Sequence, residues 1–349
     1  MAQSHEPNRA TAEQIKSEPR LRELYDNYFR IGAAVNSRTI DSQRDLLLHH
    51  FNSITAENEM KFERVHPSED VYTFEEADRI AAFAKENGIA LRGHALVWHN
   101  QTSKWVFENA DGGQVDKDTL FARMKSHIDT VAGRYKGQIY AWDVVNEAVS
   151  EEEGELLRQS KWLQIAGPEF IERAFEYAHA ADPNALLFYN DYNECGPAKR
   201  DKIYTLVKSL LDKGVPIHGI GLQAHWGPSD PSEDRIRAAI ELYASLGLRL
   251  HITEMDISVF EWKDHRTDLT EPTAEMQERH AERYETAFRI FNEYRDVIDC
   301  VTFWGVSDDY TWLDYFPVNS RKNWPFLFDV NHRTKDAFRR VAALANHSR

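Results

Sequence analysis

The stretch of sequence that decides the fold is Leu-His-Ile-Thr-Glu-Met-Asp-Ile-Ser, residues 250–258. Apolar and β-branched residues dominate it as far as Thr253, and turn-forming residues flank it on both sides. A short run of this kind is typical of a strand that is buried on both faces of a sheet. Two carboxylates, Glu254 and Asp256, lie near its carboxyl end, which is where open α/β sheets and α/β barrels place their chemistry. Glu254 is therefore the first candidate for a functional residue.

Extended, apolar segments of the same kind recur along the chain and alternate with amphipathic helical patterns. The extended segments are residues 29–36, 51–58, 90–98, 139–147, 185–193, 219–226, 248–257 and 300–307. The helical patterns cover residues 75–87, 118–135, 169–181, 198–213, 232–246, 273–294 and 336–345. This alternation predicts parallel strands joined by right-handed crossovers, and eight such units predict a closed (β/α)8 barrel, the TIM barrel of the α/β class. A doubly wound sheet of nine strands is the alternative, but the Gly-x-Gly-x-x-Gly fingerprint of dinucleotide folds is absent.

A single domain is predicted over residues 1–349, because no low-complexity or Pro/Ser/Thr-rich linker divides the chain. One α/β barrel commonly takes about 250 residues and tolerates insertions. Residues 1–28 are expected to form an N-terminal lead-in, with one short helix over residues 17–28 that begins at a capping Ser17. The long loops, residues 100–117, 149–168, 259–272 and 308–333, all follow strand carboxyl ends, so we expect them to build a deep cleft on one rim.

Charge and composition exclude several classes of function. Asp and Glu outnumber Lys and Arg by 57 to 42, and the net charge of −15 repels phosphate backbones and anionic lipids, so neither nucleic acid nor membrane is an expected partner. The two cysteines, Cys195 and Cys300, form no disulfide framework or zinc pattern and are expected to be inert thiols. The N-terminal residues do not resemble a secretion signal, so the cytoplasm is the expected location. A neutral or small substrate fits this surface best.

Polar side chains gather at the carboxyl ends of the predicted strands. Along the chain they are Glu57, Asn58, Lys61, His94, Trp98, His99, Gln101, Asn146, Glu147, Asn190, Asp191, Tyr192, Asn193, Gln223, His225, Trp226, Glu254, Asp256, Trp304 and Asp308. The fourth and seventh strands lie three positions apart in the ring, so Glu147 and Glu254 can face one another as the two carboxylates of a glycosidase do. Whether such a pair acts with retention or inversion depends on its separation, which the sequence leaves open.

Neighbouring residues indicate a role for each carboxylate. Gln223 and His225 share a face of the sixth strand, next to Glu254. An imidazole N–H donated to that carboxylate would hold it ionised, as a nucleophile requires. Glu147 follows an apolar strand and has no cation beside it in sequence, which favours a protonated general acid. Strict alternation sends Asn146 and Glu147 to opposite faces, so both can serve the site only if the strand ends or bulges there.

Aromatic residues add to the same rim. Those at or after strand ends are Trp98, Trp105, Tyr192, Trp226, Trp304 and Trp312. Flat rings stack on the apolar faces of pyranose sugars, and amides and carboxylates bind their hydroxyls, so the rim predicts a carbohydrate site. Structural alternatives exist, since the Trp side chains could belong to the core and Asp256 could only support its neighbours. His94, His99 and His225 could be zinc ligands, but strand parity points the first two apart, and no metal or cofactor is expected.

Six motifs, in order along the chain, resemble those of glycoside hydrolase family 10. They are Gly-His-Ala-Leu-Val-Trp-His (93–99), Trp-Asp-Val-Val-Asn-Glu-Ala (142–148), Asn-Asp-Tyr-Asn (190–193), Gln-Ala-His-Trp (223–226), Ile-Thr-Glu-Met-Asp-Ile (252–257) and Phe-Trp-Gly-Val-Ser-Asp (303–308). The resemblance extends from about residue 30 to the end of the chain. Members of that family are barrel-shaped endo-β-1,4-xylanases that act with retention of configuration. The resemblance implies the same activity here, with xylan or xylo-oligosaccharide as substrate.

The resemblance also implies roles for single residues. Glu254 corresponds to the nucleophile, Glu147 to the acid/base, and His225 to the histidine that orients the nucleophile. Asn146 and His94 match contacts to the sugar at the cleavage point, and Tyr192 lies where the family contacts the leaving-group side. Residues that match the non-reducing side or the aromatic pair over the cleft are Glu57, Asn58, Lys61, Trp98, Gln101, Trp304 and Trp312. Asp256 is predicted to support catalysis, and Gln223 to contact substrate.

A basic-aromatic insertion at residues 317–329, together with Leu-Tyr-Asp-Asn-Tyr-Phe at 24–29, looks like the cytoplasmic bacterial subgroup of the family. Action on short, imported xylo-oligosaccharides is then expected. The competing hypotheses are a β-glucanase, an exo-acting xylosidase, or a carbohydrate-binding protein with a dead site. Whether Trp324, Phe326 and Phe328 close the cleft or cover an interface stays open, and so does the oligomeric state.

Overall fold

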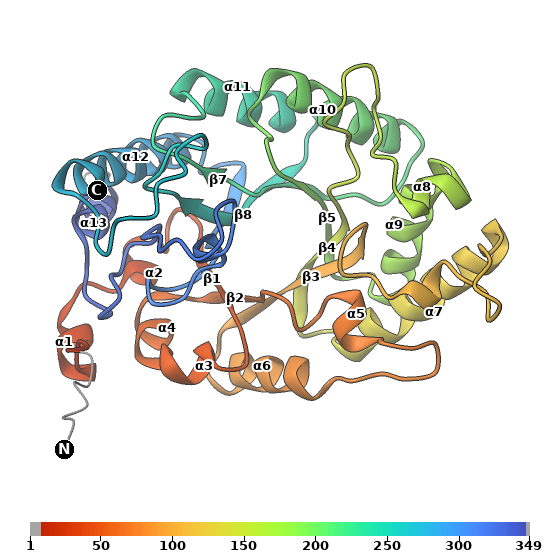
Figure 1. Ribbon diagram of the computed structural model, residues 1–349, viewed down its shortest axis with the longest axis horizontal. Helices are drawn as coiled ribbons and strands as arrows, with labels where there is room; N and C mark the ends of the chain where they lie inside the picture. The colour runs from red at the N-terminus through yellow and green to blue at the C-terminus, as the bar shows by residue number, and fades with distance from the viewer. Residues whose placement is uncertain (1–7, 347–349) are drawn as a thin grey trace.

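The computed structural model describes residues 8–346, and a sheet of parallel strands lies at its centre (Figure 1). The strands are β1 (Arg30–Val35), β2 (Ser53–Ala56), β3 (Ala90–Trp98), β4 (Ile139–Asn146), β5 (Leu186–Asp191), β6 (Gly219–Leu222), β7 (His225–Trp226), β8 (Arg249–Ile257) and β9 (Ile298–Phe303). Nearly every residue of these strands is buried or half-buried, because helices cover the outside and side chains fill the inside.

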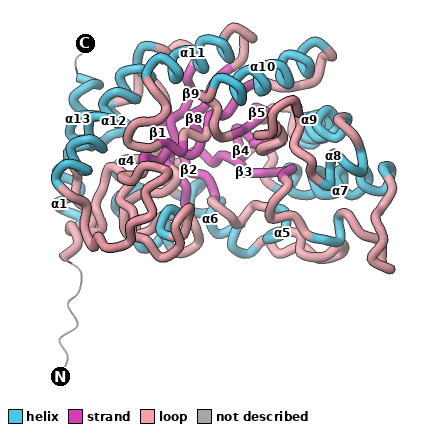
Figure 2. The backbone as a smooth tube through the Cα atoms, turned by 45° about the horizontal axis from the view of Figure 1, so that its top comes forward, coloured by secondary structure: helices cyan, strands magenta, loops and turns pink. Residues whose placement is uncertain are grey.

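Helices surround the strands, as Figure 2 shows. They are α1 (Ala12–Ser17), α2 (Leu21–Leu24), α3 (Thr39–Ser42), α4 (Arg44–His50), α5 (Phe62–Val65), α6 (Glu75–Glu86), α7 (Lys117–Arg134), α8 (Lys161–Ala166), α9 (Glu169–Ala181), α10 (Pro197–Asp212), α11 (Glu233–Ala244), α12 (Ala274–Glu293) and α13 (Asp336–Asn346), with short 3-10 turns η1 (Lys104–Val106) and η2 (Trp312–Asp314). The predicted helical patterns correspond to α6, α7 and α9 to α13. Within residues 8–346, no helix combines the length and the hydropathy needed to cross a membrane.

Pairing between the first and last strands decides the topology. Gly32 of β1 pairs with Thr302 of β9, and Ile220 of β6 pairs with Leu250 of β8, all in parallel register. β7 also pairs with β8, beyond the end of β6, so β6 and β7 occupy one position and the closed ring has eight positions. The predicted (β/α)8 barrel is therefore confirmed. The doubly wound alternative is wrong, since an open sheet has two edge strands that pair on one side only, whereas each position of this ring pairs on both sides.

The sixth predicted strand, residues 219–226, is broken in the structure. β6 ends at Leu222 and β7 begins at His225, with Ala224 between them in the left-handed region at φ 58°. A residue with positive φ interrupts the pleat, so simple alternation does not place Gln223 and His225 on one face. The break instead directs Gln223 toward Glu147, which follows β4, and His225 toward Glu254 on the adjacent β8.

The predicted single helix over residues 17–28 is wrong. α1 begins at the cap Thr11, whose side chain accepts from the N–H of Gln14 in a capping box, and the chain is extended again at Glu18 before Pro19. Proline disfavours helical geometry in the residue before it, which explains the interruption. A second short helix, α2, follows, and Tyr25 just beyond it is buried and donates its hydroxyl to the carbonyl of Val341 on α13 at 2.7 Å.

The basic-aromatic insertion folds onto the barrel. Trp324, Phe326 and Phe328 are all buried. Trp324 forms a small separate core with Val259 and Phe260 from the loop after β8, whereas Phe326 and Phe328 join the main core. Trp324 therefore packs the last long loop against the loop after β8, and Phe326 and Phe328 pack it against the barrel core. None of the three is an exposed cover.

Gly93 of β3 shows how closely the barrel is packed, because a Cβ at this position would lie 2.2 Å from the ring of Trp142. We expect Gly93→Ala to lower the free energy of unfolding by about 1–3 kcal/mol or more through overpacking, measured by denaturant titration. Gly133→Ala is the control, because Gly133 lies exposed on α7 with nothing within 4 Å of the added Cβ. That change is expected to stabilise by roughly 0.5–1 kcal/mol. Unchanged stability of Gly93→Ala would contradict the packing described.

Candidate active site

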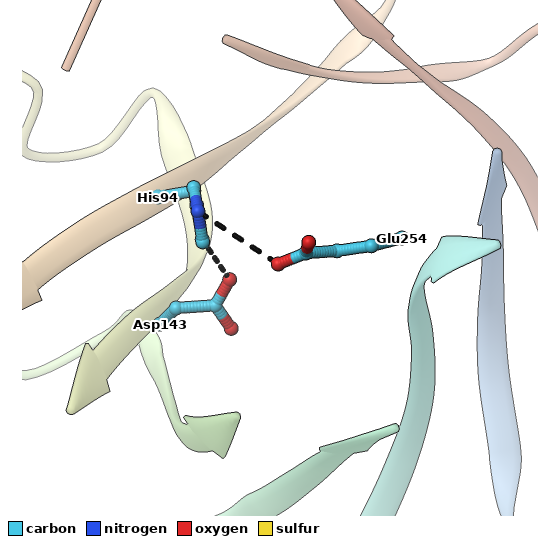
Figure 3. Close-up of side chains that lie close together, drawn as sticks. All are labelled: His94, Asp143 and Glu254. Carbon is cyan, nitrogen blue, oxygen red and sulfur yellow. Dashed lines mark hydrogen bonds and ion pairs between the residues drawn. The ribbon is translucent and has the colours of Figure 1, made fainter. Parts of the chain in front are cut away.

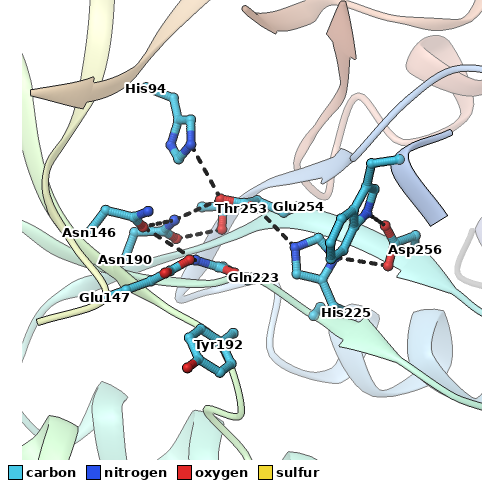
Figure 4. Close-up of polar contacts among 12 residues, drawn as sticks. His94, Asn146, Glu147, Asn190, Tyr192, Gln223, His225, Thr253, Glu254 and Asp256 are labelled. Atoms are coloured by element: carbon cyan, nitrogen blue, oxygen red, sulfur yellow. Dashed lines mark hydrogen bonds and ion pairs between the residues drawn. The ribbon is translucent and has the colours of Figure 1, made fainter. Parts of the chain in front are cut away.

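Glu147, directly after β4, and Glu254, on β8, project into the same region at the carboxyl ends of the strands (Figure 4). β4 ends at Asn146, and Glu147 follows it with φ 57°, in the left-handed region. Alternation therefore stops at Asn146, which allows both neighbours to serve one rim. Of the two solutions that the sequence left open, a strand end or a bulge, the structure has the strand end.

Glu254 is buried, with 5% of the residue exposed, and is surrounded by donors. Its Oε2 lies 2.9 Å from Nε2 of His225, and its Oε1 accepts from Nδ2 of Asn190 at 3.0 Å. Nε2 of His94 lies 3.7 Å from the same Oε1. Burial raises the pKa of Glu254. The hydrogen bond from His225 and the nearby His94 lower it by more than burial raises it, so the pKa lies below the usual value. The carboxylate is thus ionised at neutral pH.

His225 is itself held by Asp256. Its Nδ1 lies 2.9 Å from Oδ1 of Asp256, whose Oδ2 accepts from the indole N–H of Trp312 at 2.8 Å. Burial lowers the pKa of His225, but the carboxylates of Asp256 and Glu254 outweigh it, so the pKa lies well above the usual value. The imidazolium therefore donates from both nitrogens. Asp256 thus contacts both His225 and Trp312, and its predicted support of catalysis stays a prediction.

Amide side chains connect the two carboxylates. Asn190 donates to Oδ1 of Asn146 at 2.9 Å as well as to Glu254, and its own Oδ1 accepts from the hydroxyl of Thr253 at 2.6 Å. Gln223 donates to Glu147 at 3.0 Å and to Asn146 at 3.3 Å. Since the oxygen of Asn146 is occupied, its NH2 group is the part that can donate to a ligand. Asn190 and Thr253 thus fix the rotamers around Glu254.

Glu147 is half-buried and has two neutral donors. The indole N–H of Trp98 donates to Oε2 at 2.8 Å, and Gln223 donates to Oε1. A cation that is not adjacent in sequence also lies nearby: Arg158 donates Nε to the main-chain carbonyl of Glu147 at 3.0 Å and Nη2 to the hydroxyl of Tyr192 at 2.9 Å. Arg158 was missed because it comes from the loop after β4, which carries no periodic pattern.

The residues predicted to bind the non-reducing side also lie together. Nζ of Lys61 donates to Asn58 at 2.9 Å and to Gln101 at 3.0 Å, and it lies 4.8 Å from the centroid of a Trp98 ring. Glu57 accepts from the hydroxyl of Tyr310 at 3.1 Å, a contact that the sequence did not predict. Burial raises the pKa of Glu57 to about 7, although Lys61 opposes the shift.

The aromatic residues divide into two groups. Trp312 and Tyr192 are half-exposed at the rim, and the buried Trp304 packs edge-on against His94 with centroids 5.2 Å apart. Trp105 donates to the carbonyl of His66, and buried Trp226 donates to Glu194. The indole N–H groups of the last two therefore have structural partners, not a place at the open rim.

Comparison with known proteins agrees with this arrangement. The family described as Glycosyl hydrolase family 10 matches residues 20–344. The chain belongs to this family.

Individual family 10 relatives match over nearly their whole length. The chain is 62% identical to an endo-1,4-beta-xylanase of Geobacillus stearothermophilus, covering 93% of this chain and 98% of that protein. It is 58% identical to endo-1,4-beta-xylanase B of Paenibacillus barcinonensis, covering 93% and 97%. The crystal structure of xylanase XynB from Paenibacillus barcinonensis, complexed with a conduramine derivative, superposes with a TM-score of 0.92 at 58% identity, covering 93% of this chain and 98% of that one.

A cluster of three side chains in the site of this glycosyl hydrolase contains residue types that can bind a metal ion. His94, Asp143 and Glu254 offer ligand atoms within 4.8 Å of one another (Figure 3). Asp143, however, accepts two bonds of 2.6 Å from Arg92 and lies 2.8 Å from Nδ1 of His94. Burial raises the pKa of Asp143, but Arg92 and His94 lower it to about 2. A cation would have to compete with the guanidinium, so the group fits a structural ion pair better than a metal site.

The Arg92–Asp143 pair makes this family 10 barrel sensitive to loss of one charge, since each side chain is only 1% exposed. We expect Asp143→Asn to cost about 3–5 kcal/mol in unfolding free energy, because Arg92 would stay buried without its partner. The matched control is Asp299→Asn, which breaks the Arg249–Asp299 pair with side chains 41% and 35% exposed. Its expected cost is below about 1 kcal/mol. Similar costs for both variants in urea titrations would refute this role of Arg92.

Proposed function

We propose that this protein is a retaining endo-1,4-β-xylanase, in which Glu254 is the nucleophile and Glu147 the general acid/base. The observation that carries the proposal is the pairing of Glu254 with His225 and Asn190, which keeps a buried carboxylate ionised and oriented. Glu147 stands on the same rim, three positions away in the ring, and is joined to the same amide network through Gln223. The relatives that match this chain almost completely are named endo-1,4-beta-xylanases, which supports the choice of activity.

In the first step, Glu254 attacks the anomeric carbon while Glu147 gives its proton to the leaving oxygen. The bond between sugar and leaving group breaks, and a covalent glycosyl ester forms on Glu254. In the second step, Glu147 takes a proton from water, which attacks the anomeric carbon and releases Glu254. His225 holds Glu254 in position throughout, and Trp98 and Gln223 hold Glu147. Two carboxylates suffice for this chemistry, so the proposed mechanism uses no metal or cofactor.

Substrate contacts are proposed on both sides of the cleavage point. Asn146 and His94 would contact the sugar that reacts, and Tyr192 the leaving-group side. The proposed contacts on the non-reducing side and over the reacting sugar are Glu57, Asn58, Lys61, Trp98, Gln101, Trp304 and Trp312. A solved relative, 51% identical with a TM-score of 0.91, is described as a mutant in complex with xylotriose, which supports xylan or xylo-oligosaccharide as the substrate.

A cytoplasmic location is part of the proposal. Cys195 and Cys300 are both buried and unpaired, which is compatible with a reducing compartment. Fractionation of the source cells, with the activity followed in cytosol and medium, tests the location. Activity found chiefly in the medium would contradict it.

The direct test of the activity is a product time course on xylohexaose and cellohexaose, with the anomeric configuration followed by proton NMR. We expect early internal products from xylohexaose alone, formed as the β-anomer. Cleavage of cellohexaose would indicate a β-glucanase, release of single xylose units an exo-acting xylosidase, and an α-anomer an inverting mechanism. Tight binding without cleavage would indicate a carbohydrate-binding protein.

The acid role of Glu147 predicts a dependence on the leaving group. Glu147→Ala is expected to lower kcat/KM on xylo-oligosaccharides by roughly 10²–10⁴-fold, the usual contribution of general acid catalysis. Aryl xylobiosides with activated leaving groups need little protonation, so kcat/KM on them should fall far less. Glu151→Ala is the control, since this carboxylate lies in the same loop but pairs with Lys199. Equal losses on both kinds of substrate would show that Glu147 is not the acid.

A further inference from the structure

Two buried histidines meet between the end of α5 and the middle of α7. His66, which follows α5, is 1% exposed, and His127 on α7 is fully buried. Nδ1 of His66 lies 3.1 Å from Nδ1 of His127, and Nε2 of His66 lies 2.9 Å from the main-chain carbonyl of Glu69. We refer to His66 and His127 as the histidine pair.

The carbonyl of Glu69 decides which ring nitrogens carry hydrogen. A carbonyl oxygen only accepts, so Nε2 is the N–H of a neutral His66 and its Nδ1 is the acceptor. Nδ1 of His127 must then donate to it, which leaves Nε2 of His127 as an acceptor. That Nε2 is buried and has no hydrogen-bond partner within residues 8–346. The bond between the rings is therefore complete when both imidazoles are neutral.

Aromatic rings enclose the histidine pair. Phe62 of α5 stacks on His127, with centroids 3.5 Å apart and planes inclined by 7°. Tyr72 stacks on His66 with centroids 3.9 Å apart, and the ring of Trp105 packs edge-on against His66 at 4.5 Å. This environment is apolar, so a charged imidazole in it would lose its hydration without replacement.

The charged groups around the histidine pair do not provide a counter-charge. Glu69 and Asp70, in the turn after α5, are exposed, and Glu69 pairs with Arg123 of α7 at 3.5 Å. In the described part of the chain, no carboxylate forms an ion pair with either imidazole. Burial lowers the pKa of His66 by more than Glu69 and Asp70 raise it. Burial, and then the neighbouring His66, lower the pKa of His127 well below its usual value.

The histidine pair holds the loop after β2 and, through it, the loop after β3. The main-chain carbonyl of His66 accepts from the hydroxyl of Ser103 at 2.9 Å, and the N–H of Glu63 donates to the carbonyl of Gln101 at 2.9 Å. Lys61, directly before α5, donates to the side chain of Gln101. Fixing His66 to α7 therefore fixes the two loops that carry Lys61 and Gln101.

We propose that the histidine pair is a positioning pair for the non-reducing side of the site: as neutral rings it holds Lys61 and Gln101 in place, and protonation releases them. The inference rests on the proposed function, because Lys61 and Gln101 are proposed substrate contacts. Neither histidine belongs to the hydrogen-bond network of Glu147 and Glu254, so substrate binding should respond and the chemical steps should not.

The direction of the pH response follows from where the protons bind. In an opened loop the rings reach water and take up protons near the usual histidine pKa of about 6.5, whereas the closed loop resists them. The closed state is therefore fully favoured above about pH 6.5 and becomes less favoured as the pH falls below that value. Each histidine contributes up to roughly tenfold in the opening equilibrium per pH unit.

The first test measures opening without substrate. Hydrogen exchange of the amides of residues 61–66 is followed by mass spectrometry at pH 7.5 and pH 5.0, and each rate is divided by the intrinsic rate at the same pH. We expect the opening constant to rise roughly 30-fold if one histidine is protonated on opening and up to about 10³-fold if both are. Amides of α10, a helix without histidine, are the internal control. An opening constant that does not change with pH would overturn the proposal.

His127→Asn separates the hydrogen bond from the titration. The amide NH2 of Asn can donate to Nδ1 of His66 as the imidazole does, but it takes up no proton. We expect the opening constant at pH 7.5 to stay near that of wild type, and its rise at pH 5.0 to shrink to about 30-fold, the contribution of His66 alone. A response as large as that of wild type would exclude His127 from the device.

The second test measures kinetics on xylohexaose at pH 7.5. His127→Leu removes the donor to His66, so we expect KM to rise roughly two- to tenfold, as the loss of one hydrogen bond does, with kcat within about twofold of wild type. His127→Asn should restore the KM of wild type. His50→Leu is the matched control, because His50 is also buried, with a pKa lowered to about 3, but packs against Phe328 and Phe338. It should leave KM unchanged.

An unchanged KM in His127→Leu, or a loss confined to kcat, would overturn the positioning role. If His127→Leu does not fold, the exchange of wild type and of His127→Asn still decides the proposal. If wild type fails to cleave xylohexaose but the exchange response persists, the proposed function fails, and the histidine pair still controls the opening of the two loops.

Discussion

A carboxylate that is buried and yet ionised is the constraint on which the rest of the site depends. Burial alone raises the pKa of Glu254 and favours the protonated acid, which cannot act as a nucleophile. His225 offsets the burial through its hydrogen bond and its positive charge, and Asp256, on the same strand as Glu254, maintains that charge. Trp312 then fixes Asp256 from another loop. The charge of Glu254, the opposite charge of His225 and the ring of Trp312 at the rim are therefore connected by hydrogen bonds through Asp256.

The barrel beneath this unit is unusually polar for a core. Arg92 and Asp143 neutralise one another inside the ring, and Asp143 orients His94 toward Glu254. Such a pair contributes less to stability than apolar side chains of similar size, but it holds charged groups in one geometry. Small residues make room for it and its neighbours: a Cβ at Gly221 would lie 2.3 Å from Oδ1 of Asn190, whose Nδ2 donates to Glu254. Close packing and the buried ion pair thus hold the same side chains, His94 and Asn190, in place around Glu254.

Much of the fold could be predicted because parallel strands covered on both faces appear as continuous apolar runs, and their carboxyl ends must share one rim. That geometry also brings Glu147, His225 and Glu254 together. Positive φ at Glu147 and Ala224 has no comparable signature in non-glycine residues, so the sequence left a strand end or a bulge open at Glu147 and did not predict the broken sixth strand. Arg158 and Tyr310 come from loops without periodicity. Pro19, in contrast, is visible in the sequence and already indicates that a single helix over residues 17–28 is interrupted at Glu18.

The measurement that tests the role of Glu254 most directly is trapping of the covalent intermediate. The protein is incubated with an activated 2-deoxy-2-fluoro-β-xylobioside, which slows hydrolysis of the glycosyl ester, and its peptides are analysed by mass spectrometry. We expect a stoichiometric label on the peptide that contains Glu254, attached to that side chain. A label on Glu147, or turnover of natural substrate by a protein that is never labelled, would contradict a double displacement through Glu254.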